Sequence, residues 1–296
     1  MRWTHIPQPM QSNLKFHAQT LTRLASILVF ALAMAGTAAA QVAPVGPYGF
    51  VLNATFSDPS THGGAAMLGL ANFDGAGSVS GPYALELGSG GANPQASLSG
   101  TFTGTYVSNP NPDDPNGTTW TVSLALDIGV NLTLTAVIDN QGRGLQLAVT
   151  GCSGPICDNN LTGTVVSGVG AAEFNGLVHP VRQRFLNGSY GMQSTKSSPT
   201  PQTTLEVWTF YSASGTVSVS GTAVGPGLAM GGDTRWGTYT LNPDGSGTGT
   251  MTFQPPPGGQ NVQTFVFVIA GGHSGLLALQ TNRAGDGVRF LTGQHQ

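Results

Sequence analysis

After residue 40, apolar and polar residues alternate along most of the chain, and no window carries the three- and four-residue spacing of an amphipathic helix. One face of residues 119–128 collects the apolar side chains Trp120, Val122, Leu124, Leu126 and Ile128. Stretches beginning at Asn131 and Gly144 repeat the pattern. Side chains of a strand alternate between its two faces, so this spacing predicts half-buried strands and an all-β fold.

Turn-forming sequences separate these stretches, as in FDGAG from Phe73, DNQGRG from Asp139 and NPDGSG from Asn242. In the last of them, proline presets the first central turn position and glycine accepts the left-handed conformation that follows. We expect a hairpin here, with an inward set of Tyr239, Leu241, Met251 and Phe253. Short strands with turns every 8–12 residues or so favour antiparallel barrels, with β-sandwiches as the alternative.

Five short blocks recur in the same order in two halves of the chain, at offsets of 130–142 residues. GPYGF at Gly46 matches GSYGM at Gly188, for example, and GTY occurs at Gly104 and again at Gly237. The repeat predicts a first unit at 45–170, a linker at 171–185 and a second unit at 186–296. Eight strands are expected in the first unit, beginning near Tyr48, Ala66, Ser78, Ser97, Thr119, Asn131, Gly144 and Asn160.

The blocks GxYGF, FDGxGxVSG, GTYTxxPDGSGTxTxxF and FVFVI resemble the repeats of uncharacterised exported bacterial proteins with lipocalin-like, or calycin-like, β-barrels. The resemblance covers nearly all of the chain after residue 40, in both copies. It implies two tandem barrels of about eight strands each, a size that holds one small ligand. It implies little about activity, since the blocks consist mainly of turn and strand residues.

The first 40 residues have the pattern of a secretory signal peptide. Basic residues precede a short apolar run at 24–36, and small residues lead to a predicted cleavage point between Ala40 and Gln41. The remaining chain keeps 13 acidic and seven basic residues, a net charge of −6 without a basic cluster. We therefore expect a secreted, periplasmic or cell-surface protein with no nucleic-acid partner and no stable membrane insertion after cleavage.

Cys152 and Cys157 are the only cysteines, and a bond between them would close a loop of six residues. An oxidising compartment favours a local disulfide, which would contribute about 2 kcal/mol by restricting the unfolded chain. Two thiols without a nearby histidine are too few for a zinc site, and the spacing differs from the C-x-x-C redox motif. A structural disulfide is therefore predicted.

No nucleophile elbow, zinc-protease motif, phosphate loop or dinucleotide-binding loop is present, so we predict no cofactor and no enzymatic activity. The four histidines after residue 40 are dispersed: His62, His179, His273 and His295. A calcium site at Asp113, Asp114 and Asn116 remains an alternative to a solvated loop. Glu86 and Glu206 each stand between apolar neighbours, and this position predicts that both point away from the core.

Aromatic residues are the remaining binding candidates: Tyr106, Trp120, Trp208, Trp236 and Tyr239. They either pack in the core or line a cavity. Residues 265–269 are apolar on both faces, so the outer face also needs cover, for which the other unit is the candidate. The favoured hypothesis is a non-enzymatic binding module for a small apolar ligand. Alternatives are a structural or adhesive surface protein with solid barrels, an outer-membrane barrel, and an enzyme with dispersed site residues.

Overall fold

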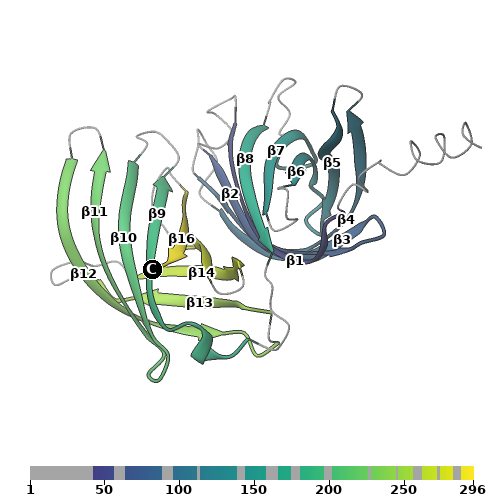
Figure 1. Cartoon of the computed structure of the whole chain (residues 1–296). Coiled ribbons are helices and arrows are strands. Elements are labelled where there is room, and N and C mark those ends of the chain that lie inside the picture. The colour runs from purple at the N-terminus through teal and green to yellow at the C-terminus, as the bar shows by residue number, and fades with distance from the viewer. Residues whose placement is uncertain are drawn as a thin grey trace, which may run out of the picture. The chain divides into compact units, whose positions relative to one another are not determined.

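The computed structural model describes residues 43–56, 64–88, 96–111, 114–138, 144–157, 166–174, 181–196, 202–225, 228–244, 246–255, 262–271, 274–282 and 288–296. They form sixteen antiparallel strands and one short 3₁₀ turn, η1 (Gln183–Phe185). The strands make two closed barrels in tandem, coloured purple to teal and green to yellow in Figure 1. The all-β prediction of two eight-stranded barrels is confirmed, and the alternative of two sandwiches is wrong because each sheet closes on itself.

The first barrel is an up-and-down sheet in chain order, and β1 closes it by pairing with both β2 and β8. Its strands are β1 (Val45–Phe56), β2 (Ala65–Asp74), β3 (Ser78–Leu87), β4 (Ala96–Asn111), β5 (Asp114–Leu126), β6 (Asn131–Ile138), β7 (Gly144–Ser153) and β8 (Val166–Phe174). Seven of the eight begin within about five residues of the expected positions. The eighth, expected near Asn160, begins at Val166.

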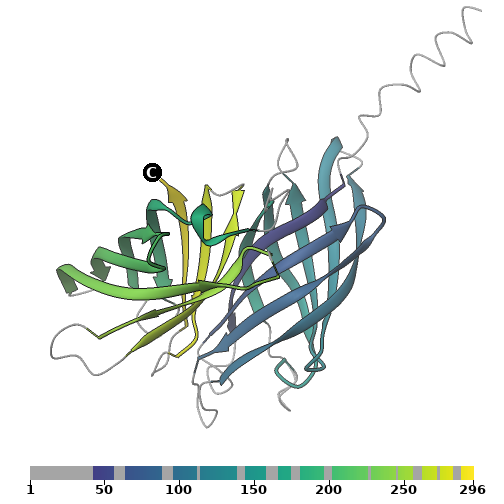
Figure 2. The same ribbon diagram turned by 90° about the horizontal axis from the view of Figure 1, so that it is seen from below.

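The second barrel has the same plan, and β9 closes it between β10 and β16. Its strands are β9 (Gly188–Lys196), β10 (Gln202–Tyr211), β11 (Thr216–Gly225), β12 (Leu228–Leu241), β13 (Thr248–Phe253), β14 (Gln263–Ala270), β15 (Gly275–Gln280) and β16 (Arg289–His295). Figure 2 shows both barrels from another side. The predicted hairpin is β12–β13, with Tyr239 opposite Met251.

Alternation along each strand supplies a separate hydrophobic core for each barrel. The predicted inward face of β5 is buried in the first core, as are Leu134, Ala136 and Ile138 of β6. Tyr239, Met251 and Phe253 are buried in the second core, and Leu241 packs against it. Each core thus comes from one face of its own sheet, as the period of two requires.

A third hydrophobic cluster consists of outward-facing residues. It combines Val51, Ala66, Leu68 and Leu70 with Val268, Ala270, Leu277, Leu279 and Val288. The first four belong to β1 and β2, and the others to β14, β15 and the residue before β16. Residues 265–269 are apolar on both faces, and their outer face was expected to pack against other apolar residues. This cluster supplies those residues.

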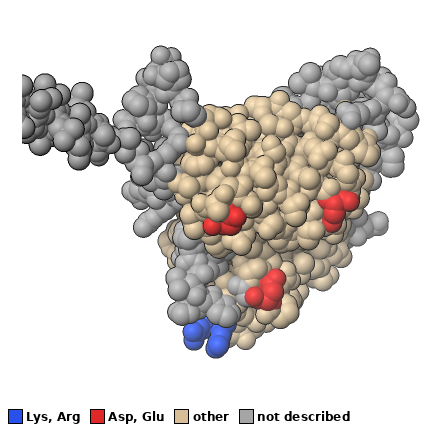
Figure 3. Space-filling view, turned by 90° about the vertical axis from the view of Figure 1, so that its right-hand side faces the viewer, with Lys and Arg blue, Asp and Glu red and all other residues tan. Residues whose placement is uncertain are grey.

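The surface carries few charges, in keeping with a chain in which 8% of residues are charged. On the face shown in Figure 3, the acidic groups lie apart from one another among uncharged residues. Within the described part of the chain, no helix has the length and apolar character needed to cross a membrane. The predicted signal peptide and its cleavage point at Ala40 and Gln41 lie outside the described residues.

Candidate functional site: an apolar cavity in the first barrel

One end of the first barrel contains a cavity of about 50 Å³. It is lined by Leu52, Ala54, Ala65, Met67, Leu85, Leu87, Leu126, Val130, Leu132, Val149, Cys152, Ile156 and Cys157. Every lining residue is apolar or a half-cystine, and most are buried. A second cavity of about 20 Å³ lies among Phe50, Phe73, Val79, Leu145 and other apolar residues of the same core. The interior of this barrel therefore contains unfilled apolar space.

Small residues help to create the larger cavity. Ala54 of β1 lies opposite Ala65 of β2, and both face the interior. A pair of methyl groups leaves room at a position where two leucines would fill the barrel. The cavity therefore depends on side-chain size on two neighbouring strands, a property that alternation alone does not specify.

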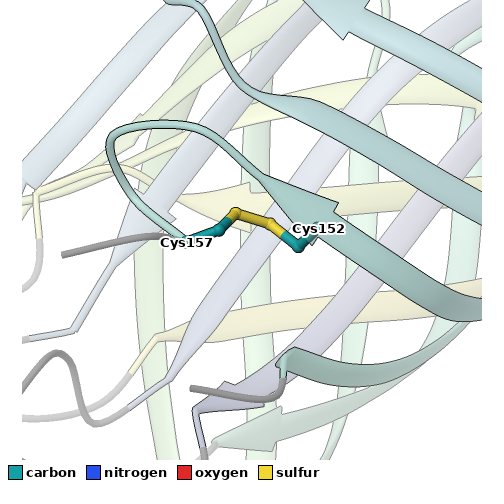
Figure 4. The surroundings of a disulfide bond; sticks show 2 residues. All are labelled: Cys152 and Cys157. Carbon is teal, nitrogen blue, oxygen red and sulfur yellow. A yellow bond between two sulfur atoms is a disulfide. The ribbon is translucent and has the colours of Figure 1, made fainter. Parts of the chain in front are cut away.

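The disulfide forms part of the cavity wall. Cys152 lies near the end of β7 and Cys157 in the turn that follows, with their Cα atoms 5.7 Å apart (Figure 4). The backbone N–H of Cys157 donates to the carbonyl of Gly154 at 2.8 Å, which closes the turn. The predicted disulfide is confirmed. It also holds the 152–157 segment against the cavity, a role that the sequence did not indicate.

Polar groups at the same end of the barrel bond to one another. The Tyr83 hydroxyl donates to Asp127 Oδ1 at 2.9 Å, and the Thr101 N–H donates to Oδ2 at 2.8 Å. Burial, followed by the bond to Asp127, raises the pKa of Tyr83. The Thr101 N–H and the Tyr83 hydroxyl lower the pKa of Asp127. These bonds link β3 and β4 to the turn after β5 and place no polar group in the cavity wall.

Aromatic side chains fill the opposite end. Phe73 makes edge contacts with Tyr48 and Tyr106, at ring-centroid distances of 5.3 and 5.1 Å. Trp120 lies beside Tyr106 at 5.6 Å, and its buried Nε1 has no hydrogen-bond acceptor among the described residues. Tyr106 donates to the carbonyl of Pro44 at 3.2 Å, which ties the residue before β1 to this end. The larger cavity thus lies away from this aromatic cluster, beside the disulfide.

The second barrel is filled by aromatic residues. Trp208 contacts Phe253 and Phe265 edge to face, at 5.3 and 5.4 Å between ring centroids. Tyr239 contacts Phe210 at 5.2 Å, and its hydroxyl donates to the carbonyl of Leu186 at 3.1 Å. Burial raises the pKa of Tyr239. These large rings occupy the interior that the first barrel leaves partly empty.

A layer of charged groups covers one end of the aromatic core. Glu206 Oε1 accepts from Arg235 at 3.2 Å and also from Arg289, while Oε2 accepts from Trp208 Nε1 at 2.7 Å. Burial alone raises the pKa of Glu206, but the charges of Arg289 and Arg235 outweigh it, so the pKa lies below its usual value. Gly221 makes room for this carboxylate, since a Cβ there would lie 2.6 Å from Glu206 Cγ.

The position of Glu206 corrects a prediction. The prediction placed Leu205 and Val207 in the core, yet Leu205 is 61% exposed and Glu206 is buried. The inward face of β10 consists of Glu206, Trp208 and Phe210, so the prediction chose the wrong face. Glu86 differs: Leu85 and Leu87 belong to the core as expected, but Glu86 itself is buried and accepts from the Ser97 hydroxyl.

The five aromatic candidates do not form one site. Tyr106 and Trp120 belong to the first core, while Trp208 and Tyr239 belong to the second. Trp236 is 56% exposed and stacks on Tyr211 at 5.9 Å, so its assignment to a barrel interior is wrong. The cavity lining was missed because it consists of aliphatic residues and the disulfide. The only available signal was the small pair Ala54 and Ala65 within an otherwise bulky strand pattern.

The remaining candidates fall partly outside the described residues. His62, His179, His273 and Asp113 lie there, as do the side chains of Asp114 and Asn116. His295 is exposed, contacts the Tyr190 ring and lies 3.2 Å from the carbonyl of Asn187. Among the side chains that the structure describes, no group of three His, Cys, Asp or Glu residues converges as a metal site.

Comparisons with known proteins give no family. No protein-family model and no curated protein sequence matches the chain. Among solved structures, similarity is found to CghA with Sch210972, at 9% identity and a TM-score of 0.25, covering 86% of this chain and 89% of that one. Similarity is also found to isotype 1 transferrin binding protein B (TbpB) from serogroup B Neisseria meningitidis, at 7% identity and a TM-score of 0.27. That match covers 86% of this chain and 77% of TbpB, and neither match is close enough to indicate function.

Proposed function

We propose that the protein is an exported, non-enzymatic binding protein whose first barrel takes up a small apolar ligand, or the apolar end of a larger one. The observation that carries this proposal is the 50 Å³ cavity with a wholly apolar wall. Cavities of this character stay dry and bind apolar molecules, because the lining offers water no hydrogen-bond partners. Burial of the ligand would contribute about 25 cal/mol for each Å² of apolar surface removed from water.

The proposed location outside the cytoplasm has two supports. The Cys152–Cys157 disulfide persists in oxidising compartments and is rare in the cytosol. The first 40 residues have the arrangement of a cleavable export signal, with small residues before Gln41. Both features concern compartment alone and are independent of the ligand.

The proposal of a non-enzymatic role rests on what the described carboxylates do. Asp74 accepts from the N–H groups of Ala76 and Ser78 and so shapes the β2–β3 turn. Asp127 holds a barrel end, and Glu206 is engaged by two arginines and a tryptophan. A wide groove of about 800 Å³ is lined by residues of β9, β10, β11, β15 and β16 together with Gln296, and the carboxylate among them is the arginine-paired Glu206. Such groups lack an activated acid, base or nucleophile.

The proposal is tested by native mass spectrometry and solvent extraction of the purified protein, followed by titration with an environment-sensitive apolar dye. Ala65→Leu adds three carbon atoms to the cavity wall and should weaken dye binding at least tenfold. The matched control is Ala125→Leu, which makes the same change at an exposed position of β5. Equal binding by the wild type and both variants, with no co-purified apolar molecule, would contradict the proposal.

A structural or adhesive surface role is the second candidate. It is favoured by the second barrel, in which Trp208, Phe253 and Phe265 fill the interior. A protein of this kind would bind no small molecule in either barrel. It would keep its surface attachment when Ala65→Leu fills the cavity, so a cell-adhesion assay of that variant separates the two roles.

A further inference from the structure

Among the side chains that the structure describes, the charged layer of the second barrel has more positive than negative charge. Two guanidinium groups, of Arg235 and Arg289, share the single carboxylate of Glu206. The strands of this barrel also contain Lys196 and Asp233, so their Lys, Arg, Asp and Glu residues comprise three cations and two anions. A buried excess of positive charge is costly unless an anion compensates it.

The arginines are held in place by more than the carboxylate. Arg235 lies over the Phe253 ring at 5.9 Å, and Arg289 lies over the Phe265 ring at the same distance. Arg289 also donates to the hydroxyls of Ser194 at 3.3 Å and Thr204 at 3.2 Å. Fixed guanidinium groups bind oxyanions well, because little side-chain freedom remains to be lost on binding.

One donor in this layer has no acceptor. Nε of Arg235 is buried and has no hydrogen-bond partner among the described residues, although its two terminal nitrogens bond to Gln263 and Glu206. Such a group costs free energy unless an acceptor meets it. The side chains of Arg235 and Arg289 retain 14% and 10% exposure, so solvent-borne ions can reach them.

We propose that this end of the second barrel binds a small oxyanion, a carboxylate or a phosphate, with Arg235 and Arg289 as its ligands. Glu206 positions both guanidinium groups and leaves a positive charge over for the anion. Ser194 and Thr204 add hydroxyl groups within the same layer. The site is independent of the apolar cavity, since the two lie in different barrels.

The Trp208 indole reports on the site because its N–H donates to Glu206. The test titrates the purified protein with sodium phosphate and, separately, sodium acetate, while sodium chloride keeps the ionic strength constant. The Trp208 indole resonance, assigned from a Trp208→Phe spectrum, is followed by ¹H–¹⁵N NMR. A saturable shift with at least one of the two anions is expected, while the Trp236 resonance stays in place. The absence of a saturable shift with both anions would overturn the proposal.

Arg235→Gln should weaken anion binding at least tenfold, whereas Arg184→Gln removes the same charge at an exposed position and should leave binding unchanged. Equal weakening by both variants would mean that only general electrostatic attraction acts, and would refute the site. Arg235→Lys is the second test, since it keeps the charge but loses the planar set of donors. Wild-type affinity in this variant would also refute the role of Arg235 and leave a purely structural ionic layer.

Discussion

The two barrels have the same number of strands and the same topology, but their interiors are filled differently. The first contains aliphatic residues, a small Ala54–Ala65 pair and two cavities. The second contains a cluster of large rings around Trp208, with a charged layer above it. The comparison shows that strand number sets the diameter of a barrel, while side-chain size decides whether the interior is hollow.

The largest effect is expected from Glu206→Gln, because it leaves two guanidinium groups without their counter-charge. Removing one partner of a buried ionic cluster costs about 3–5 kcal/mol, so the free energy of unfolding should fall by that amount in a urea titration. The control is the neighbouring Leu205→Ser, which changes an exposed side chain and should cost less than about 0.5 kcal/mol. A larger loss from Leu205→Ser would mean that Leu205 lies in the core, as the sequence analysis predicted.

Glu206 should also make the free energy of unfolding depend on pH, and Glu206→Gln should remove this dependence. The pKa of Glu206 is lowered in the folded state, so its contribution is present above the unfolded pKa and is lost as pH falls through the folded value. Wild-type stability should therefore decline in acid more steeply than that of Glu206→Gln. Parallel curves between neutral pH and the acid limb would show that Glu206 contributes no pH-dependent stability.

An alanine-to-valine substitution adds two carbon atoms to the interior of each barrel and so tests how completely each interior is filled. Ala278 is fully buried in the second core, and Ala278→Val should cost about 1–3 kcal/mol through overpacking. Ala65→Val extends into the cavity of the first barrel and should be neutral or stabilising. Thermal unfolding monitored by circular dichroism gives both values. Equal destabilisation would mean that the first barrel is packed as tightly as the second.

Loss of the disulfide should affect the first barrel alone. The double variant Cys152→Ala and Cys157→Ala should lose about 2 kcal/mol of stability, since the unfolded chain is no longer restricted. Apolar dye binding should weaken with it, because the 152–157 turn forms part of the cavity wall. The Trp208 indole resonance provides the internal control and should not move. A shift there would show that the barrels are coupled.

The smallest effect is expected at Trp236, the exposed aromatic candidate. Trp236→Ala removes a stacking contact with Tyr211 and should cost about 0.5–1.5 kcal/mol, measured by urea unfolding. Trp208→Ala, in contrast, empties the centre of the second core and should cost about 3–5 kcal/mol. Similar costs for the two tryptophans would contradict the assignment of Trp236 to the surface.

The fold was predictable because its signals are local. Alternation placed Trp120, Val122 and Leu124 on one face of β5, and turn sequences marked the hairpin of β12 and β13. The faces of β10 were not predictable in the same way, since both faces carry apolar residues and the inward one also carries the charged Glu206. For Trp236 the sequence did contain the signal: the residue lies an odd number of positions from the buried Tyr239 and therefore faces the opposite side of β12.

The sequence by itself determined the all-β class and the disulfide and favoured two tandem barrels over two sandwiches, because alternation, turn residues and cysteine spacing act over a few positions. Only the tertiary structure decided which face of β10 turns inward, since Arg235 and Arg289 reach Glu206 from 29 and 83 residues away. It also decided that the first barrel contains free space. A cavity is the space inside the barrel that side chains from many strands leave unfilled, and no single stretch of sequence encodes its volume.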